Sequence, residues 1–261
     1  MSCIRVSLIL LISAICFWGC KEDIPSDDNP NDPFADNKRP LGTSAEELLT
    51  DTDYNTLLIE FVYAAGFRPR EATITALRTF LNTHLNKPGG ILIQETVIDA
   101  PEGAPYNSQE IRDIEDNNRT AYNEGNTIAV YVFFSNGSAF GDSQNTVTLG
   151  SAYRNTSIVI YEKTLRDIAV ANPTFGLTNL ETTTLQHEFG HLLGLTNILD
   201  DDIHNMHEDP NRNKHCVVEE CLMYFEASFS NRSDLMRVFG KGNTPKLDPL
   251  CIEDLQAKGG K

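Results

Sequence analysis

Four segments of the chain have the apolar pattern of β-strands. Residues 56–67 are rich in β-forming side chains and end at a glycine, and residues 89–98 follow a glycine turn. Residues 126–136 are almost wholly apolar, which is typical of a strand buried on both faces. Residues 145–165 contain a glycine-interrupted extended piece and then a further strand. A sheet of several strands is therefore predicted for the first two thirds of the chain.

Helical patterns lie between and after these strands. Residues 69–85 carry apolar side chains at helical spacing behind a proline, and residues 108–123 and about 179–195 are also predicted to be helical. Residues 196–220 are polar and irregular, and helical pattern returns only after Asn231. The alternation predicts an α/β (α+β) fold: a mixed twisted sheet with packed helices, and a smaller loop-rich C-terminal lobe.

The first 45 residues differ from this pattern. Residues 1–20 hold one basic residue, Arg5, and an apolar run from 6 to 18 that is short for a membrane span of about 20 residues. The run ends at Gly19-Cys20, which resembles a bacterial lipoprotein signal cleaved before a lipidated Cys20; an ordinary cleaved signal is the alternative. Residues 21–45 are acidic and proline-rich and are predicted to be a disordered tether, which leaves 46–261 as one domain with subdomains of about 46–195 and 196–261.

Charge and cysteine content narrow the function and the compartment. The formal charge of −16 argues against nucleic-acid binding or electrostatic membrane binding, so membrane contact is expected only through the lipid anchor. We expect an exported monomer anchored in the bacterial outer membrane, facing either the periplasm or the cell surface. Outside the signal only Cys216, Cys221 and Cys251 remain, and in an oxidising compartment one disulfide and one leftover thiol are conceivable.

The segment TLQHEFGHLLGLTN (184–197) carries the chemistry. His187 and His191 are four residues apart, which places both imidazoles on one face of a helix, where they can bind one zinc ion. Glu188 then lies beside the metal, where it can act as general base toward water and pass the proton to the leaving amine. Gly194 can take the positive φ that ends the helix and turns the chain back toward the metal.

These four residues resemble the pattern of the metzincin clan of zinc proteases, which places a third zinc ligand three residues after the glycine. Here that position is Asn197, a poor zinc ligand. The third ligand is therefore expected in the polar segment 198–225, which holds His204, His207 and His215. An Asp or Glu side chain of that segment is a further alternative.

The segment HCVVEECLM (215–223) resembles the archaemetzincin pattern, in which the third zinc histidine directly precedes a cysteine and a methionine forms a tight turn beneath the metal. The resemblance implies His215 as third ligand and Met223 as that methionine, although Met223 is also typical of an ordinary core position. The chain lacks the later pair of closely spaced cysteines that completes a second zinc site in archaemetzincins. We therefore expect one catalytic zinc ion, and a disulfide joining two of the three cysteines.

The whole mature chain is also similar to a group of exported bacterial lipoproteins that are zinc metalloproteases. The shared segments are LNKPGGI (85–91), HEFGHLLGL (187–195), HED (207–209) and HC…CLMY (215–224). Because both histidines recur in that group, His207 stays open as the alternative to His215.

The resemblances imply a zinc-dependent peptidase, with an endopeptidase as the first expectation. An archaemetzincin-type zinc aminopeptidase and a non-catalytic surface binding lipoprotein on the same scaffold are the alternatives. Residues 148–160 occupy the place where metzincins have the edge strand of the cleft, so a peptide substrate is expected to add to it as a further strand.

Overall fold

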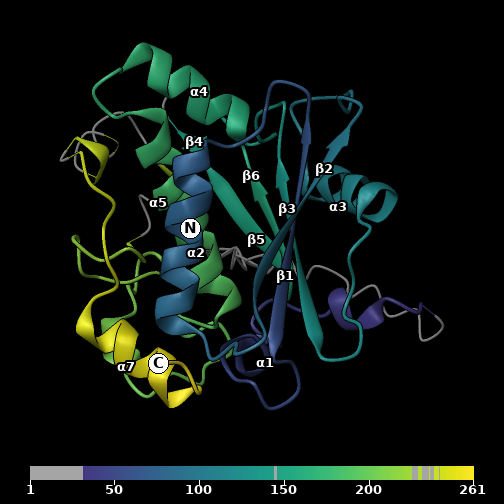
Figure 1. Cartoon of the computed structure of the whole chain (residues 1–261). Helices are drawn as coiled ribbons and strands as arrows, with labels where there is room; N and C mark the ends of the chain where they lie inside the picture. Colours follow the sequence, from purple (N-terminus) through teal and green to yellow (C-terminus); the bar gives the residue numbers. More distant parts are fainter. Residues whose placement is uncertain (1–31, 144–145, 225–228, 231–234, 236–237, 241) are drawn as a thin grey trace, which may run out of the picture.

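A five-stranded sheet lies at the centre of the molecule, with strand order β2-β1-β3-β6-β5 (Figure 1). Its strands are β1 (Thr56–Ala64), β2 (Gly90–Ile98), β3 (Thr127–Phe134), β6 (Ser157–Ile160) and β5 (Gly150–Arg154). The first four run parallel, and the edge strand β5 runs antiparallel to β6. A two-stranded ribbon pairs β4 (Val147–Thr148) with β7 (Phe229–Ser230). The computed structural model describes residues 32–143, 146–224, 229–230, 235, 238–240 and 242–261.

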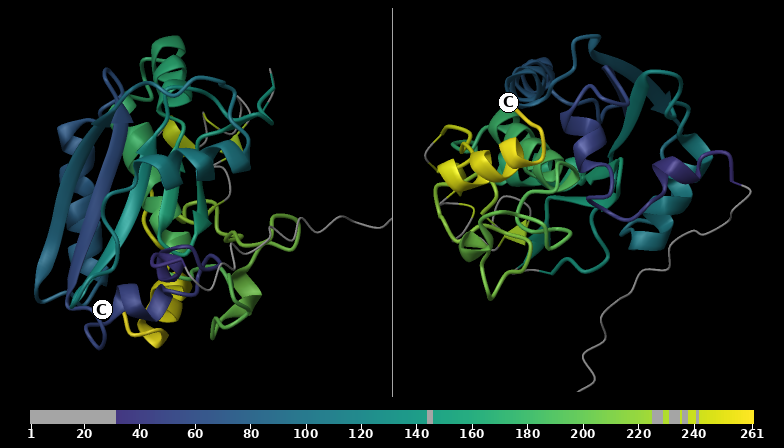
Figure 2. Two further views of the ribbon diagram at one scale, coloured as in Figure 1. Left: turned by 90° about the vertical axis from the view of Figure 1, so that its right-hand side faces the viewer. Right: turned by 90° about the horizontal axis from the view of Figure 1, so that it is seen from below.

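Helices cover both faces of this sheet. The connection from β1 to β2 contains α2 (Glu71–His84), and the connection from β2 back past β1 to β3 contains α3 (Ser108–Asn118). Because parallel crossovers keep a right-handed sense, connections that run in opposite directions along the sheet place their helices on opposite faces. Figures 1 and 2 show α2 on one face together with α4 (Glu162–Ala171) and α5 (Leu177–Leu192), and α3 on the other.

The side chains of β3 alternate between two hydrophobic clusters. Val130, Val132 and Phe134 belong to the larger cluster, which includes apolar residues of α2, α4 and α5. Tyr131 and Phe133 belong to the smaller cluster on the α3 side. The prediction that 126–136 is buried on both faces is therefore confirmed.

The predicted strands and helices are found within a few residues of their expected bounds, with one exception. Residues 162–165 were expected to continue a strand, but they form the first turn of α4. The sequence gives no start signal there, because the N-cap residue Tyr161 makes no side-chain capping hydrogen bond. By contrast, α3 begins with a complete capping box between Asn107 and Glu110.

The tether predicted for residues 21–45 is wrong from residue 32 onward. A short 3₁₀ helix, η1 (Ala35–Asn37), precedes the helix α1 (Ala45–Leu49). The Asn37 side chain is buried, and its amide donates to the Ala129 carbonyl at 3.2 Å and to Asn123 Oδ1 at 2.8 Å. Buried polar contacts of this kind thus fix a segment whose composition suggested solvation. The predicted signal, Cys20 and the start of the tether lie outside the described residues. Among the described residues, no helix is long and apolar enough to cross a membrane.

The segment LNKPGGI (85–91) fixes the turn between α2 and β2. Lys87 is buried, and its ammonium donates to the carbonyls of Glu47, Thr50 and Tyr54. It thereby ties the loop before β1 to the turn before β2, so these two neighbouring strands begin at a common level.

Candidate metal centre

The helix α5 passes through the middle of the protein, and every residue from Leu180 to Leu192 is buried. It ends at Leu192, and Gly194, two residues further on, has φ +77°. The Leu195 amide donates to the Gly190 carbonyl at 3.0 Å and the Gly194 amide donates to the His191 carbonyl at 3.1 Å. This pair of bonds is a Schellman motif, which requires a left-handed residue after the helix. The positive φ predicted for Gly194 is confirmed.

The two helix histidines face each other at their Nε2 atoms, which are 3.0 Å apart. His187 Nδ1 lies 2.7 Å from the Leu222 carbonyl oxygen, which can only accept, so Nδ1 carries the proton. The lone pair of His187 is therefore on Nε2, the atom that faces His191. This orientation by a carbonyl is common for histidines that bind metals.

His215 completes the group from the loop after the helix. Its ring centroid lies 5.3 Å from that of His187 and 5.1 Å from that of His191. One nitrogen of each of the three rings lies within 4.8 Å of the others. His215 Nδ1 is 3.0 Å from the Asn213 carbonyl, which leaves Nε2 as the nitrogen without the proton. The structure therefore brings His215 to the helix histidines.

Hydrogen bonds join the two ends of the long loop between α5 and His215. The Thr196 hydroxyl donates to the Lys214 carbonyl, and the Lys214 ammonium donates to the Asn197 carbonyl. Asn197 does not join the histidines: its side-chain amide donates to Glu208 at 3.2 Å and its backbone amide donates to Asp202 at 2.6 Å. The chain thus leaves the site at 197 and returns to the same place at 214, so the inserted residues extend the loop without displacing the ligand.

Met223 is fully buried and lies against α5 at Gly190, the residue before His191. A methyl group added at Gly190 would lie 2.3 Å from Met223 Sδ. Gly190 therefore allows close contact between α5 and the turn at 221–224, in which the Tyr224 amide donates to the Cys221 carbonyl at 3.1 Å. Met223 therefore packs against α5 next to the helix histidines, and its role as the methionine of a metzincin turn stays a prediction.

Glu188 points from α5 toward the edge strand β5. It is 1% exposed, and its Oε2 accepts a hydrogen bond of 2.8 Å from the Ala152 amide. Burial raises the pKa of Glu188 to about 8, and the Ala152 amide opposes the rise. The close approach of helix and strand depends on Gly150, because a Cβ there would lie 2.8 Å from Thr184 Cγ2 and 3.1 Å from Glu188 Oε1.

Burial keeps the three histidines neutral. It lowers the pKa of His187 to about 3, and it also lowers the pKa values of His191 and His215. Only the neutral imidazole can offer a lone pair to a metal ion. The cluster therefore presents three ligand nitrogens at neutral pH without having to lose a proton.

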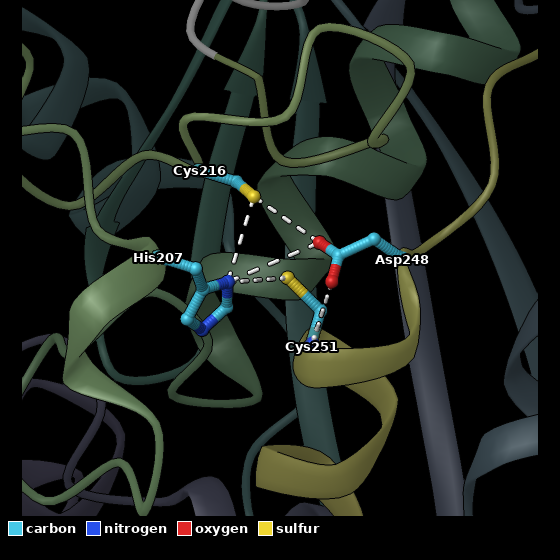
Figure 3. A group of neighbouring side chains, drawn as sticks. All are labelled: His207, Cys216, Asp248 and Cys251. Atoms are coloured by element: carbon cyan, nitrogen blue, oxygen red, sulfur yellow. Dashed lines mark hydrogen bonds and ion pairs between the residues drawn. The ribbon is translucent and has the colours of Figure 1, made fainter.

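The structure places His207 away from these histidines, in a second cluster. Its Nε2 lies 2.8 Å from Asp254 Oδ2, and its Nδ1 faces Cys216, Cys251 and Asp248 (Figure 3). The contact with Cys216 raises the pKa of His207 to about 9. Of the two histidines left open by the sequence, His215 is thus the one beside α5.

The predicted disulfide is not formed. Cys216, Cys221 and Cys251 are all free thiols, and the sulfurs of Cys221 and Cys251 are 3.7 Å apart. Sequence reasoning also missed Asp248 and Asp254 as partners of these residues. Asp248-Pro249 is a recognisable start signal for α7 (Pro249–Ala257), and the Asp248 side chain does cap that helix. No local pattern indicates that α7 packs against the loop of His207.

The mixed sheet, its antiparallel edge strand and the histidine-bearing helix define a fold of the archaemetzincin type. The chain is similar in structure to the crystal structure of archaemetzincin from Methanopyrus kandleri, with a TM-score of 0.51 over 78% of this chain and 96% of that chain. The two sequences are 17% identical, so this likeness establishes the fold class and confirms that prediction. No protein-family model and no curated protein matches the sequence.

Proposed function

We propose that this protein is a zinc-dependent peptidase, and that it acts first of all as an endopeptidase. One observation carries the proposal: the imidazoles of His187, His191 and His215 converge beside the buried carboxylate of Glu188, next to the edge strand β5. Three neutral histidines with an adjacent carboxylate are the donor set of a catalytic zinc site that keeps one position open.

The donor set fits zinc in chemistry and in orientation. The nitrogens of His187 and His215 that face away from the cluster are committed to the Leu222 and Asn213 carbonyls. The nitrogens that remain are those that face the centre of the group. A zinc ion bound there would polarise a peptide carbonyl and make a neighbouring water molecule more acidic.

Glu188 is the proton carrier in this proposal. Its Oε1 is buried without a hydrogen-bond partner, while Oε2 is held by the Ala152 amide. An unpartnered buried carboxylate oxygen is poised to accept a proton from attacking water and to return it to the leaving amine. Burial alone favours the protonated acid, and a nearby dication favours the carboxylate that general-base catalysis requires.

The edge strand β5 is the proposed binding site for the peptide substrate. Its register with β6 shifts between Ala152 and Arg154, and the Ala152 amide donates to Glu188 across the site. A peptide that added to the free edge of β5 would offer carbonyl oxygens to the outward amides of that strand. Such a carbonyl would compete with Glu188 for the Ala152 amide, so substrate binding would free the carboxylate for proton transfer.

Replacing Glu188 by glutamine tests the proposal, because the amide keeps the shape but cannot take a proton. We expect Glu188→Gln to bind zinc like the wild type and to cleave a mixed peptide library about 10²–10⁴ times more slowly. Glu46→Gln, at an exposed position in the first turn of α1, serves as the control and should cleave at the wild-type rate. Equal cleavage by Glu188→Gln and the wild type would refute the mechanism.

Peptides with blocked and free N-termini decide between endopeptidase and aminopeptidase activity. Cleavage inside blocked peptides supports the proposal, whereas release of single residues from free N-termini only would favour the aminopeptidase alternative.

We also propose that the protein is exported and lipid-anchored at Cys20 and acts as a monomer on peptide or protein substrates. This setting rests on residues 1–20 and on the acidic charge of the chain.

A further inference from the structure

We propose that the chain binds a second metal ion, of zinc type, through His207, Cys216, Cys251 and Asp248. This cluster is separate from the three histidines around α5 and plays no part in the proposed peptide cleavage. Its ligand atoms come from the inserted loop, from the residue after His215, and from the start of α7 (Figure 3). It also differs from the four-cysteine site implied by the archaemetzincin resemblance, because an imidazole and a carboxylate take two of the four places.

The distances between the donor atoms suit a tetrahedral zinc ion. Zinc–sulfur bonds of about 2.3 Å and zinc–nitrogen bonds of about 2.0–2.1 Å imply sulfur–nitrogen separations of about 3.6 Å in a tetrahedron. His207 Nδ1 lies 3.5 Å from Cys216 Sγ and 3.8 Å from Cys251 Sγ. Asp248 Oδ2 lies 3.1 Å from Cys216 Sγ and 3.9 Å from His207 Nδ1. All four donors are within 4.8 Å of one another.

The surroundings of His207 orient it as a metal ligand. Its Nε2 lies 2.8 Å from the carboxylate of Asp254, which is fully buried. A carboxylate accepts at Nε2, so Nδ1, the atom that faces the two sulfurs, is the nitrogen that would give up its proton and offer a lone pair to a metal ion. Metal-bound histidines are commonly fixed by a carboxylate in this way. Asp254 also accepts from the His204 amide at 2.9 Å, which anchors the inserted loop to α7.

The surroundings of the other donors are also those of ligands. Cys216 Sγ lies 3.4 Å from the amide of Val218, two residues on, which is an N–H bond that favours a thiolate. Asp248 uses its Oδ1 to cap α7, accepting from the Leu250 amide at 2.8 Å, and its Oδ2 faces the cluster. One oxygen is thus committed to the fold while the other remains for a metal.

Cys221 is the third buried cysteine of this region. Its sulfur is 3.7 Å from that of Cys251 and accepts from the amides of Met223 and Asp248, at 3.3 and 3.4 Å. The group of donor atoms that all lie within 4.8 Å of one another contains Asp248 and not Cys221, so we assign the fourth ligand position to Asp248. The assignment also explains why three buried thiols of an exported protein stand together without a disulfide.

Counting zinc in the purified protein after loading and removal of free metal tests the inference. We expect two zinc ions per wild-type chain, one in His207→Ala or Cys251→Ser, and one in His191→Ala, which loses the ion at α5 instead. His204→Ala is the matched control, because His204 also contacts Asp254 but faces no sulfur, and it should keep two. One ion per wild-type chain, lost in His191→Ala, would overturn the proposal while leaving the peptidase proposal intact.

Cobalt substitution tests the site without any change to a cysteine. Cobalt bound to thiolates gives charge-transfer absorption in the near ultraviolet, whereas a site of three histidines does not. We expect this absorption in the cobalt-loaded wild type and equally in His191→Ala. Its absence from the wild type would overturn the proposal.

The fourth ligand is tested by Asp248→Asn, because asparagine caps a helix as well as aspartate but is a poor zinc ligand. We expect Asp248→Asn to give up the second zinc to a chelator at least tenfold faster than Cys221→Ser does. The opposite order would replace Asp248 by Cys221 in the ligand set.

Discussion

The contact between Gly190 and Met223 yields a quantitative prediction about the proposed zinc site. Gly190 lies in the last turn of α5, one residue before His191, and a Cβ there would be 2.3 Å from Met223 Sδ and 2.9 Å from its Cε. Comfortable separations between such atoms are about 3.5–4.0 Å. Gly190→Ala therefore forces either the helix or the methionine to move by about an ångström.

Two opposing effects set the magnitude. Alanine in place of glycine favours a helix by about 1 kcal/mol, and overpacking a close-packed core costs about 1–3 kcal/mol. Met223 is fully buried and cannot swing into solvent, so the cost falls in the upper half of that range. We expect Gly190→Ala to lower the free energy of unfolding by about 1–2 kcal/mol, and to weaken zinc binding because the helix histidines rest on this contact.

Urea denaturation of four proteins measures this contact: the wild type, Gly190→Ala, Met223→Ala and the double variant. Met223→Ala alone should cost about 2–5 kcal/mol through the cavity it leaves. In the double variant the added methyl partly fills that cavity, so the two costs should fall short of additivity by about 0.5–3 kcal/mol. Gly141→Ala, where a Cβ meets no atom within 4 Å, is the control. Strict additivity, or a Gly190→Ala protein as stable as the wild type, would refute the reasoning.

Three further predictions concern other buried contacts. Burial and the Glu181 carboxylate raise the pKa of Glu162 from 4.5 to about 9, so the folded protein keeps a proton that the unfolded chain releases. The free energy of unfolding should therefore fall as pH rises from about 4.5 to about 9. Denaturation at several pH values should show a shallower fall in Glu162→Gln than in the wild type, and an equal fall in both proteins would contradict this role. Gly150→Ala would bring a methyl within 2.8 Å of Thr184 Cγ2 and displace the face of α5 that carries the proposed base Glu188. The kcat for peptide cleavage should therefore fall about tenfold or more while the zinc content stays the same, and an unchanged kcat would contradict this role of Gly150. Lys87→Met should lower the free energy of unfolding by about 2–4 kcal/mol in thermal or urea denaturation, because three carbonyls lose their hydrogen-bond donor. An effect below about 0.5 kcal/mol would show that water molecules replace the ammonium as donors to these carbonyls.

The sequence alone determined the parts of the site that are local. The spacing of His187 and His191 puts both on one face of any helix, and Gly194 supplies the left-handed residue that ends it, so both features follow from backbone geometry. The strands could be predicted equally well, since the continuous apolar run of β3 reflects two covered faces. The start of α4 could not be predicted from the sequence, because its N-cap residue has no capping side chain.

Only the tertiary structure shows that His215, rather than His207, lies beside the two helix histidines. His207 and His215 lie in one polar loop, and nothing in their local pattern distinguishes a residue beside α5 from one beside α7. The choice is made by contacts between residues far apart in sequence: Thr196 with Lys214 returns the chain to the histidines, and Asp254 holds His207 on the other side. The cysteines illustrate the same limit. The expected oxidising compartment and the missing later cysteine pair suggested a disulfide, whereas the packing of α7 against the inserted loop places an imidazole and a carboxylate beside Cys216 and Cys251.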